Sequence, residues 1–248
     1  MQPETWPVIV GALAANHAVF FGASLWPRSR LIGANIVRLP QAAAQRGEVA
    51  LTFDDGPDPE VTPRVLDLLD GYKAKASFFC VGERVRAHPK IVREIVRRGN
   101  SVENHSLHHS MHFGWLGPSA LHRDLEAAQA LIAEITGRAP AFFRAPFGTR
   151  SPLLDPVLAR CGLRLVSWTR RGFDAVDVNA TRVLQRLSKG LAAGDVLLLH
   201  DGAWPSARRG APTVLAVLPE LLGRIAARGL RAVSLPSACD VAGQRNEP

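Results

Sequence analysis

Short apolar runs alternate along most of this chain with longer segments whose apolar positions follow a helical spacing. The short runs predict strands at residues 49–53, 76–81, 101–103, 141–144, 163–168, 196–199 and 230–235. The longer segments predict helices that begin at Thr62-Pro63 or cover residues 89–98, 118–136, 179–191 and 212–228. Alternation of this kind predicts an α/β fold with a mostly parallel sheet, either open or closed into a barrel.

The first apolar segment differs from the others because it carries no formal charge between Trp6 and Trp26. Its length is about that of a membrane span, and tryptophan at both ends is typical of the membrane interface. Asn16 and His17 lie in its middle. A signal peptide fits less well than an anchor because no basic region precedes the run. We therefore expect residues 1–27 to be an apolar segment and a candidate membrane anchor, with a buried or amphipathic helix as the alternative.

Composition indicates one folded domain behind that segment. Of 248 residues, 47% are hydrophobic and 21% are charged, which suits a packed core rather than a disordered chain. We expect a linker at residues 28–47, the main domain at 48–236 and a tail at 237–248. The formal net charge of +8 comes mostly from scattered arginines, and no basic cluster alternates with aromatics, so we expect no nucleic-acid partner. Three widely spaced cysteines offer neither a disulfide framework nor a metal-binding pair.

Basic residues follow the apolar segment, at Arg28, Arg30 and Arg38. On their own they would place the main domain in the cytoplasm. A further segment upstream would reverse this orientation across the membrane. We expect a protein associated with the membrane or the cell envelope, with its sidedness left open.

Polar side chains that can carry chemistry follow four of the predicted strands, at the point where each strand ends. They are Asp54 and Asp55, His105 and His109, Arg144, and His200 with Asp201. Because the carboxyl ends of parallel strands share one face, we expect these residues to line one site. Two adjacent carboxylates repel each other. A metal ion would change that balance by holding one carboxylate and leaving the other to move a proton.

The histidine pair has a spacing that suits metal ligands. On a helical turn, positions i and i+4 share one face, so His105 and His109 would hold one ion together. With one carboxylate they would form a site with open coordination positions, which suits zinc or another borderline divalent metal. His108 and His112 lie in the same stretch and compete as ligands, and surface histidines are the alternative interpretation.

Arg144 would pair with the carboxylate that does not bind the metal, and His200 would act on the leaving group. A buried guanidinium needs an anion, and the unligated carboxylate of the aspartate pair is the natural partner of Arg144. His200 ends an aliphatic run, so its ring would face the same mouth and donate a proton to a departing amine. The alternative interpretation of Arg144 is an arginine on a surface turn, and that of His200 is a histidine buried in the core with its hydrogen bond satisfied.

In this order, the motifs resemble those of the polysaccharide deacetylase family, carbohydrate esterase family four, which includes nodulation-type chitooligosaccharide deacetylases. The resemblance covers about residues 46–236. Residues 52–57 read Thr-Phe-Asp-Asp-Gly-Pro, the first family motif, and residues 105–109 fit His-Ser/Thr-x-x-His. Residues 144–148 fit Arg-x-Pro-aromatic-Gly, and residues 198–200 fit Leu-x-His.

The resemblance implies a role for each matching residue. Asp54 would be the catalytic base, oriented by Arg144, and His200 would be the general acid. The metal, with zinc as the expected ion, would be held by Asp55, His105 and His109. Phe147, where the family usually has tyrosine, would offer its backbone N–H to the oxyanion, and Leu198 would line the pocket for the acetyl methyl group.

The fourth family motif, Asp-x-x-Asp-Trp, is the departure. Only Asp174 lines up, while Arg171 stands in place of the first aspartate and Ala175 in place of the tryptophan. We expect Asp174 to tether His200, with Asp177 as the alternative. The departure concerns the shape of the acyl pocket and the substrate more than the reaction.

The resemblance implies a distorted, incomplete (β/α) barrel that hydrolyses the N-acetyl group of an amino sugar in a metal-dependent reaction and releases acetate. The substrate would be a chitooligosaccharide, peptidoglycan or a similar glycan. A deacylase or deformylase acting on a lipid-linked amino sugar at the membrane is the main alternative. A catalytically silent sugar-binding domain and an amidase acting on cyclic imides or non-sugar amides are two further ones.

Overall fold

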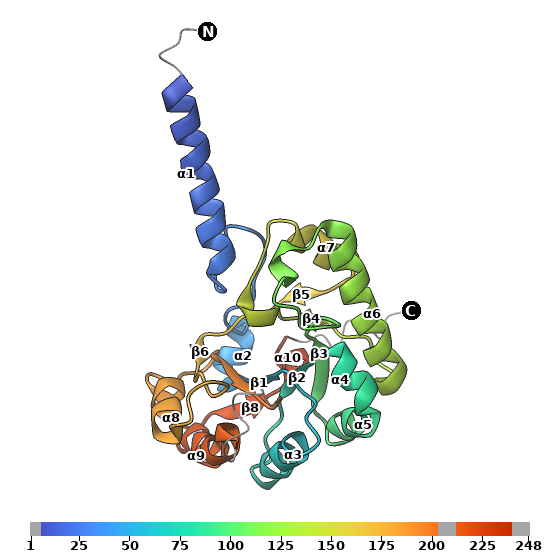
Figure 1. Ribbon diagram of the computed structural model, residues 1–248. Helices are drawn as coiled ribbons and strands as arrows, with labels where there is room; N and C mark the ends of the chain where they lie inside the picture. The colour runs from blue at the N-terminus through green and yellow to red at the C-terminus, as the bar shows by residue number, and fades with distance from the viewer. Residues whose placement is uncertain (1–5, 203–211, 240–248) are drawn as a thin grey trace.

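The computed structural model describes residues 6–202 and 212–239, and one parallel sheet lies at its centre (Figure 1). The strands follow the order β5-β4-β3-β2-β1-β7-β6, and β8 also pairs with β1. Their bounds are β1 (Glu48–Asp54), β2 (Ser77–Cys80), β3 (Ser101–Asn104), β4 (Phe142–Phe143), β5 (Arg164–Leu165), β6 (Arg170–Arg171), β7 (Val196–His200) and β8 (Arg231–Val233).

Helices surround the sheet, with α3, α5, α8 and α9 along its lower side in Figure 1 and α6 at its right. Two short 3-10 turns, η2 (Phe113–Trp115) and η3 (Pro146–Gly148), lie in the loops. The helices are α1 (Trp6–Leu25), α2 (Gln41–Gln45), α3 (Thr62–Gly71), α4 (Gly82–Ala87), α5 (Pro89–Arg97), α6 (Pro118–Thr136), α7 (Leu154–Arg160), α8 (Ala180–Ser188), α9 (Thr213–Ala227) and α10 (Leu235–Ala238).

The sheet curls into a half-barrel because its two edges are joined by a short piece of chain. Strands β5 and β6 lie at opposite ends of the strand order, yet only residues 166–169 separate them in sequence. Within this connection Val166 bridges to Ile36, and Thr169 donates its backbone N–H to Val196 of β7. The incomplete α/β barrel predicted from the sequence is therefore confirmed.

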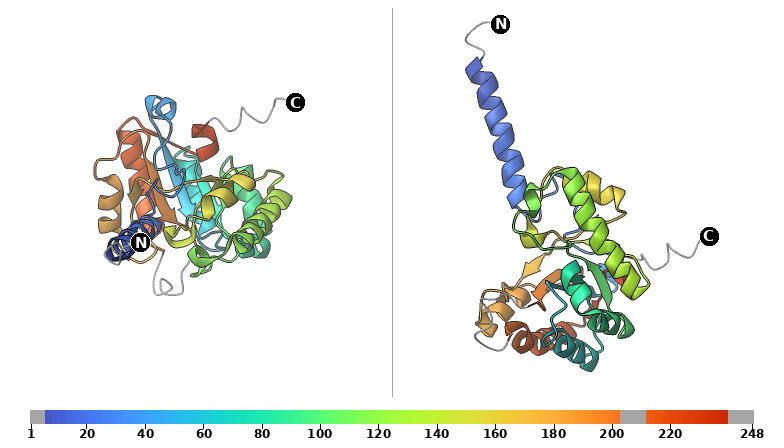
Figure 2. Two further views of the ribbon diagram at one scale, coloured as in Figure 1. Left: turned by 90° about the horizontal axis from the view of Figure 1, so that it is seen from above. Right: turned by 45° about the vertical axis from the view of Figure 1, so that its right-hand side comes forward.

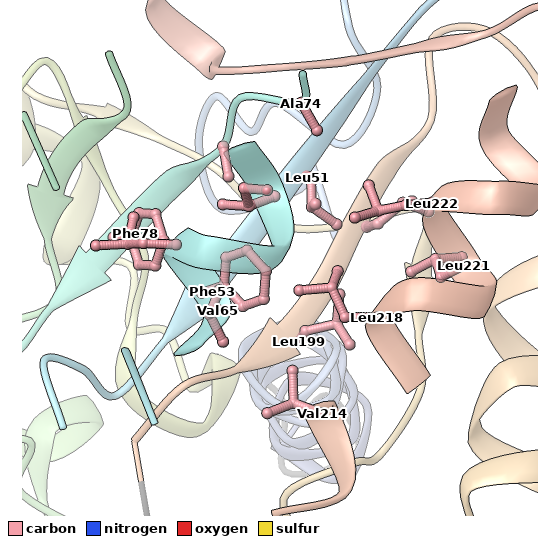
Figure 3. Packing of buried hydrophobic residues seen from close by; sticks show 14 of the residues in the cluster. Leu51, Phe53, Val65, Ala74, Phe78, Leu199, Val214, Leu218, Leu221 and Leu222 are labelled. Atoms are coloured by element: carbon pink, nitrogen blue, oxygen red, sulfur yellow. The ribbon is translucent and has the colours of Figure 1, made fainter. Parts of the chain in front are cut away.

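Strand β1 is buried along its whole length, and its two faces meet different neighbours. Leu51 and Phe53 point toward the helices, where the Phe53 ring stacks on Phe78 of β2 with centroids 5.0 Å apart (Figure 3). Because side chains alternate along a strand, Thr52 and Asp54 point the other way, into the half-barrel. The packing of the outer face thus fixes the direction in which the first catalytic candidate points.

Helix α1 projects away from the rest of the molecule (Figures 1 and 2). Ala23 is its buried residue, and the remaining side chains of the helix are mostly exposed. The helix has the length and composition of one that crosses a membrane, although a signal sequence has the same properties.

The segment that follows α1, expected from the sequence to be a linker, lies against the barrel. The Pro27 carbonyl accepts hydrogen bonds from the Ser167 hydroxyl and the Asn35 amide. The guanidinium of buried Arg150 donates to the carbonyls of Ser29 and Ile32. Side chains further along this segment, at Leu39 and Ala43, join a buried cluster with strands β1 and β7. The end of α1 is thereby held close to residue 167, which lies in the connection that curls the sheet.

Candidate active site

Most of the candidate site residues predicted from the sequence lie where strands β1, β3, β4 and β7 end. Asp54 and His200 are the last residues of β1 and β7, and they are Cα partners in the register of those two strands. Paired residues in parallel strands project to the same face of the sheet, so both side chains lie in the half-barrel. Asp55 follows with a φ of 71°, a left-handed conformation that turns its carboxylate toward the loop after β3.

Asp55, His105 and His109 form a cluster of potential metal ligands. Asp55 Oδ1 lies 3.2 Å from His105 Nε2 and 3.1 Å from His109 Nε2, and one donor atom from each residue lies within 4.8 Å of the others. Burial acts to raise the pKa of Asp55, but hydrogen bonds with the two histidines outweigh it and hold the pKa well below its usual value. Asp55 is therefore an anion that could serve as a metal ligand.

The second ring nitrogen of His105 explains why the cluster suits a cation. His105 Nδ1 lies 2.8 Å from the backbone carbonyl of Arg144, which can only accept, so Nδ1 carries a proton. In the neutral ring, the Nε2 lone pair then faces Asp55 Oδ1, and two acceptors at this distance need a proton or a metal ion between them. One carboxylate and two imidazoles are the donor types that zinc takes in open sites.

The two histidines converge through a loop, so the expectation that they lie on a helical turn is wrong. Residues 105–109 are not helical, and Ser106 and His109 have φ values of 68° and 50°. The Ser106 hydroxyl accepts the His109 N–H, which closes the turn. The competing histidines point elsewhere: His108 pairs with exposed Glu83, and His112 is exposed.

Asp54 is held by a buried arginine. Arg144, whose side chain is 1% exposed, donates from Nη1 to Asp54 Oδ1 at 2.6 Å and to the Thr52 hydroxyl at 2.8 Å. Its Nε and Nη2 donate to the carbonyls of Val166 and Ser167. The guanidinium carbon lies 4.2 Å from the centroid of the Phe79 ring. Burial lowers the pKa of Arg144, and the Asp54 carboxylate opposes that change. The ion pair thus fixes Asp54 in one orientation.

His200 is held by Asp174. One carboxylate oxygen lies 3.0 Å from His200 Nδ1, and the other accepts the His200 backbone N–H at 2.8 Å. Burial acts to lower the pKa of His200, but Asp174, helped by Asp55 and Asp54, raises it to about 9. Asp177, the alternative tether, is bound instead by Arg182 and Arg186.

Phe147 and Leu198 lie at the edges of this constellation. The Phe147 ring lies 4.7 Å from the His109 ring, and the residue has a φ of 57°. Leu198 is buried in β7 two positions before His200, so both side chains project to the same face. All nine candidate site residues therefore border one end of the half-barrel.

Close backbone approach at this end depends on two glycines. A β-carbon at Gly56 would lie 2.4 Å from the carboxylate of Asp201, and one at Gly202 would lie 2.3 Å from the carbonyl oxygen of Asp55. Asp201 is buried, accepts a hydrogen bond from the Thr62 hydroxyl, and has a pKa raised by burial to about 7. These contacts bring the ends of β1 and β7 together.

The sequence predicted a carboxylate of the aspartate pair as the partner of Arg144, and the structure places Asp54 there. The other three hydrogen-bond partners of Arg144 were missed. Thr52 could have been found, because its alternation with Asp54 places it on the same face of β1. The carbonyls of Val166 and Ser167 carry no signal in the sequence, since any residue supplies a carbonyl.

Comparison with known proteins agrees with this arrangement. The family model described as polysaccharide deacetylase matches residues 41–166. A peptidoglycan-N-acetylglucosamine deacetylase from Bacillus cereus is 32% identical over 175 residues, which are 70% of this chain and 81% of that protein. A chitooligosaccharide deacetylase from Azorhizobium caulinodans is 32% identical over 201 residues, or 77% of this chain and 94% of that protein.

Solved structures match the fold over most of the chain. A peptidoglycan N-acetylglucosamine deacetylase superposes with a TM-score of 0.76 at 26% identity, covering 83% of this chain and 92% of that one. A family 4 carbohydrate esterase from Streptomyces lividans, in complex with acetate, gives a TM-score of 0.67 at 33% identity, covering 75% of this chain and 91% of that one.

Proposed function

Because this chain belongs to the polysaccharide deacetylase family, we propose that it hydrolyses the N-acetyl group of an N-acetylated amino sugar and releases acetate. Its curated relatives are named for deacetylation of chitooligosaccharides and peptidoglycan, and the Streptomyces lividans relative is in complex with acetate. We also propose that the reaction depends on a divalent metal, with zinc as the expected ion.

One observation carries the proposal. A cluster of metal-ligand types, a carboxylate held by a buried arginine and an imidazole held by a second carboxylate all lie at the same end of the half-barrel. Asp54 and His200 are thus each oriented by a charged partner. A cation held by Asp55, His105 and His109 would supply a Lewis acid that polarises the acetamide carbonyl and makes water more acidic.

The side chains of the protein then divide the proton transfers. Asp54, oriented by Arg144, accepts a proton from the attacking water. His200, kept protonated by Asp174, gives a proton to the nitrogen of the departing amine. The backbone N–H of Phe147 is assigned to the developing oxyanion, and Leu198 is assigned to the wall that receives the acetyl methyl group.

A membrane location is a separate proposal, supported by α1. Its apolar side chains extend all round the helix and are not covered by the domain, so a bilayer is the environment that suits them. On this basis we propose that residues 1–27 anchor the domain to a membrane or the cell envelope. The same feature supports a lipid-linked amino sugar as the alternative substrate, with an acyl or formyl group removed.

The test is acetate release from chitooligosaccharides, peptidoglycan and lipid-linked N-acetylhexosamines, measured with and without added zinc after treatment with a chelator. We expect release from at least one glycan, abolished by the chelator and restored by the metal. Release from the lipid-linked sugar alone would favour the alternative substrate. No release from any substrate, combined with measurable sugar binding, would leave a silent binding domain instead.

A further inference from the structure

Arg171 is a guanidinium inside the half-barrel that has no anionic partner among the residues that the structure describes. It lies in β6, where it is the Cα partner of Leu198 in β7, and Leu198 is in turn the partner of Thr52 in β1. Partners in parallel strands share a face, so Arg171 projects to the same side as the candidate acyl-pocket wall. Its neighbour Arg170 points outward and pairs with Asp195.

Contacts with aromatic rings agree with this placement. The Arg171 guanidinium lies 5.4 Å from the centroid of the Trp168 ring, and the Arg144 guanidinium lies 5.9 Å from the same ring. The positive charge of Arg171 also contributes to lowering the pKa of Arg144, behind the larger effect of burial. Phe173 covers Arg171 from another direction, with its ring centroid 4.7 Å from the guanidinium carbon. Arg171 is thus close to the residue that orients Asp54.

The missing partner is unusual among the guanidiniums of this region. Within residues 6–202 and 212–239, the Arg171 side chain makes neither a hydrogen bond nor an ion pair, and its Nε is buried without an acceptor. By contrast, Arg144, Arg170 and Arg186 each reach both a carboxylate and a backbone carbonyl. A partly desolvated charge without an anion is unfavourable, and stacking on aromatic rings offsets only part of that cost.

We propose that Arg171, flanked by Trp168 and Phe173, forms an anion-binding subsite beside Leu198 that takes a carboxylate or phosphate group of the substrate sugar. This rests on the proposed deacetylase function. A planar guanidinium binds either group with two parallel hydrogen bonds. Phe173 is 43% exposed and Ala175 replaces the tryptophan of the family motif, so the subsite opens toward solvent. The preferred substrate is therefore an N-acetylated amino sugar that carries an acidic group.

The kinetic test uses sugars that differ only in charge. Acetate release is measured from neutral N-acetylglucosamine oligomers, from matched oligomers that contain N-acetylmuramic acid, and from N-acetylglucosamine 1-phosphate. In Arg171→Gln we expect KM for the preferred acidic sugar to rise about tenfold or more, with kcat and the neutral KM unchanged. The carboxylate and phosphate arms show which acidic group the subsite takes.

Two further variants separate charge recognition from structure. Arg171→Lys keeps the positive charge but loses the planar guanidinium that makes two parallel hydrogen bonds. We expect its KM for the acidic sugar to lie between the wild-type and Arg171→Gln values. Arg164→Gln is the matched control, because it removes an exposed guanidinium stacked 5.3 Å from the Phe142 ring on the opposite edge of the sheet. We expect wild-type kinetics from it. If Arg171→Gln raised KM equally for neutral and acidic sugars, Arg171 would be a structural residue and the subsite would be refuted.

A binding measurement keeps the subsite separate from the reaction. Calorimetric titration of the metal-stripped protein with N-acetylmuramic acid, N-acetylglucosamine 1-phosphate and N-acetylglucosamine should show tighter binding of an acidic sugar, and Arg171→Gln should remove that preference. If the stripped protein prefers an acidic sugar but the zinc-loaded protein releases acetate from no sugar, the subsite is supported and the deacetylase proposal is contradicted. Equal binding of the three sugars by the wild type, together with acetate release, refutes the subsite alone.

Discussion

The two sides of the candidate site are built differently, although each holds one candidate proton carrier. On the base side, Asp54 is bound by Arg144, and that arginine has four hydrogen bonds inside the protein. On the acid side, His200 depends on Asp174, which lies in a loop with several exposed apolar side chains. The base side also keeps the family motif unchanged, whereas the acid side departs from it at Arg171 and Ala175. The departures from the family motif in this chain therefore lie on the acid side, at the proposed anion-binding subsite.

The strongest test of the base side removes the candidate metal site beside it. His105→Ala deletes one of three ligands and the ring that bridges Asp55 to the Arg144 carbonyl. We expect zinc content, measured by elemental analysis, to fall to background, and acetate release to be lost with it. The control is His108→Ala, which changes a histidine paired with exposed Glu83. Unchanged zinc content in His105→Ala would show that the ligand set is wrong.

Asp54→Asn should separate the base from the metal. The variant keeps all three ligands, so zinc content should stay near that of the wild type, while turnover falls on the order of 100- to 10,000-fold. Asp177→Asn serves as the control, because Asp177 is a carboxylate bound by Arg182 and Arg186 on the surface. Near-normal acetate release from Asp54→Asn would remove Asp54 from the base role.

On the acid side, Asp174→Asn should shift the pH profile. His200 must be protonated to donate, so activity falls as pH rises through its pKa, which Asp174 raises to about 9. Without Asp174, burial lowers that pKa, and the alkaline limb of kcat/KM should move to lower pH with at least a roughly tenfold loss at mildly alkaline pH.

The shift between the two proteins is the quantity to measure in this experiment. A cation on Asp55 would offset part of the carboxylate contribution to the His200 pKa in both proteins, so it does not explain a difference between them. Asp177→Asn should leave the alkaline limb in place. Superimposable profiles for Asp174→Asn and the wild type would show that Asp174 does not set the protonation of His200.

The smallest expected effect comes from Thr52→Val on the base side. The Thr52 hydroxyl donates to the Leu197 carbonyl and accepts from Arg144, so the change removes two hydrogen bonds while keeping the shape of the side chain. We expect the free energy of unfolding to fall by about 1–2 kcal/mol, with a few-fold loss of turnover. Thr136→Val removes comparable bonds at the end of α6 and should reduce stability without reducing turnover. Equal effects of both variants on turnover would show that Thr52 has no particular link to the base.

The parallel sheet was accessible from the sequence because its central strands are continuous apolar runs. Every position of β1 is buried, so the run at residues 49–53 could hardly be anything else. Strand β6 was missed because Arg170 and Arg171 have no apolar pattern, and only pairing with β7 defines them as a strand. Helix α7 was missed because its 7 residues are too few to show a clear helical period.

The candidate site was accessible for a different reason: each polar residue follows an apolar strand, and parallel strands end on one face. That rule located Asp54, Asp55, Arg144 and His200 without knowledge of their contacts. It did not reveal how His105 and His109 converge, because the loop depends on left-handed residues that no helical spacing describes. Alignment with the family motif favoured Asp174 over Asp177 as the tether of His200 but did not exclude Asp177. In the folded chain it is Asp174 that contacts His200.

The carbonyl of Pro27 links the end of the apolar helix to the candidate active site. It accepts the Ser167 hydroxyl, and the Ser167 carbonyl accepts Arg144, the residue that holds Asp54. A β-carbon at Gly148 would also lie 2.7 Å from the Pro27 ring, so the turn that bears Phe147 rests on the same proline. A protein that lacks residues 1–37 would lose Pro27 and would therefore represent the full chain poorly. A protein that lacks only residues 1–26 would keep this support.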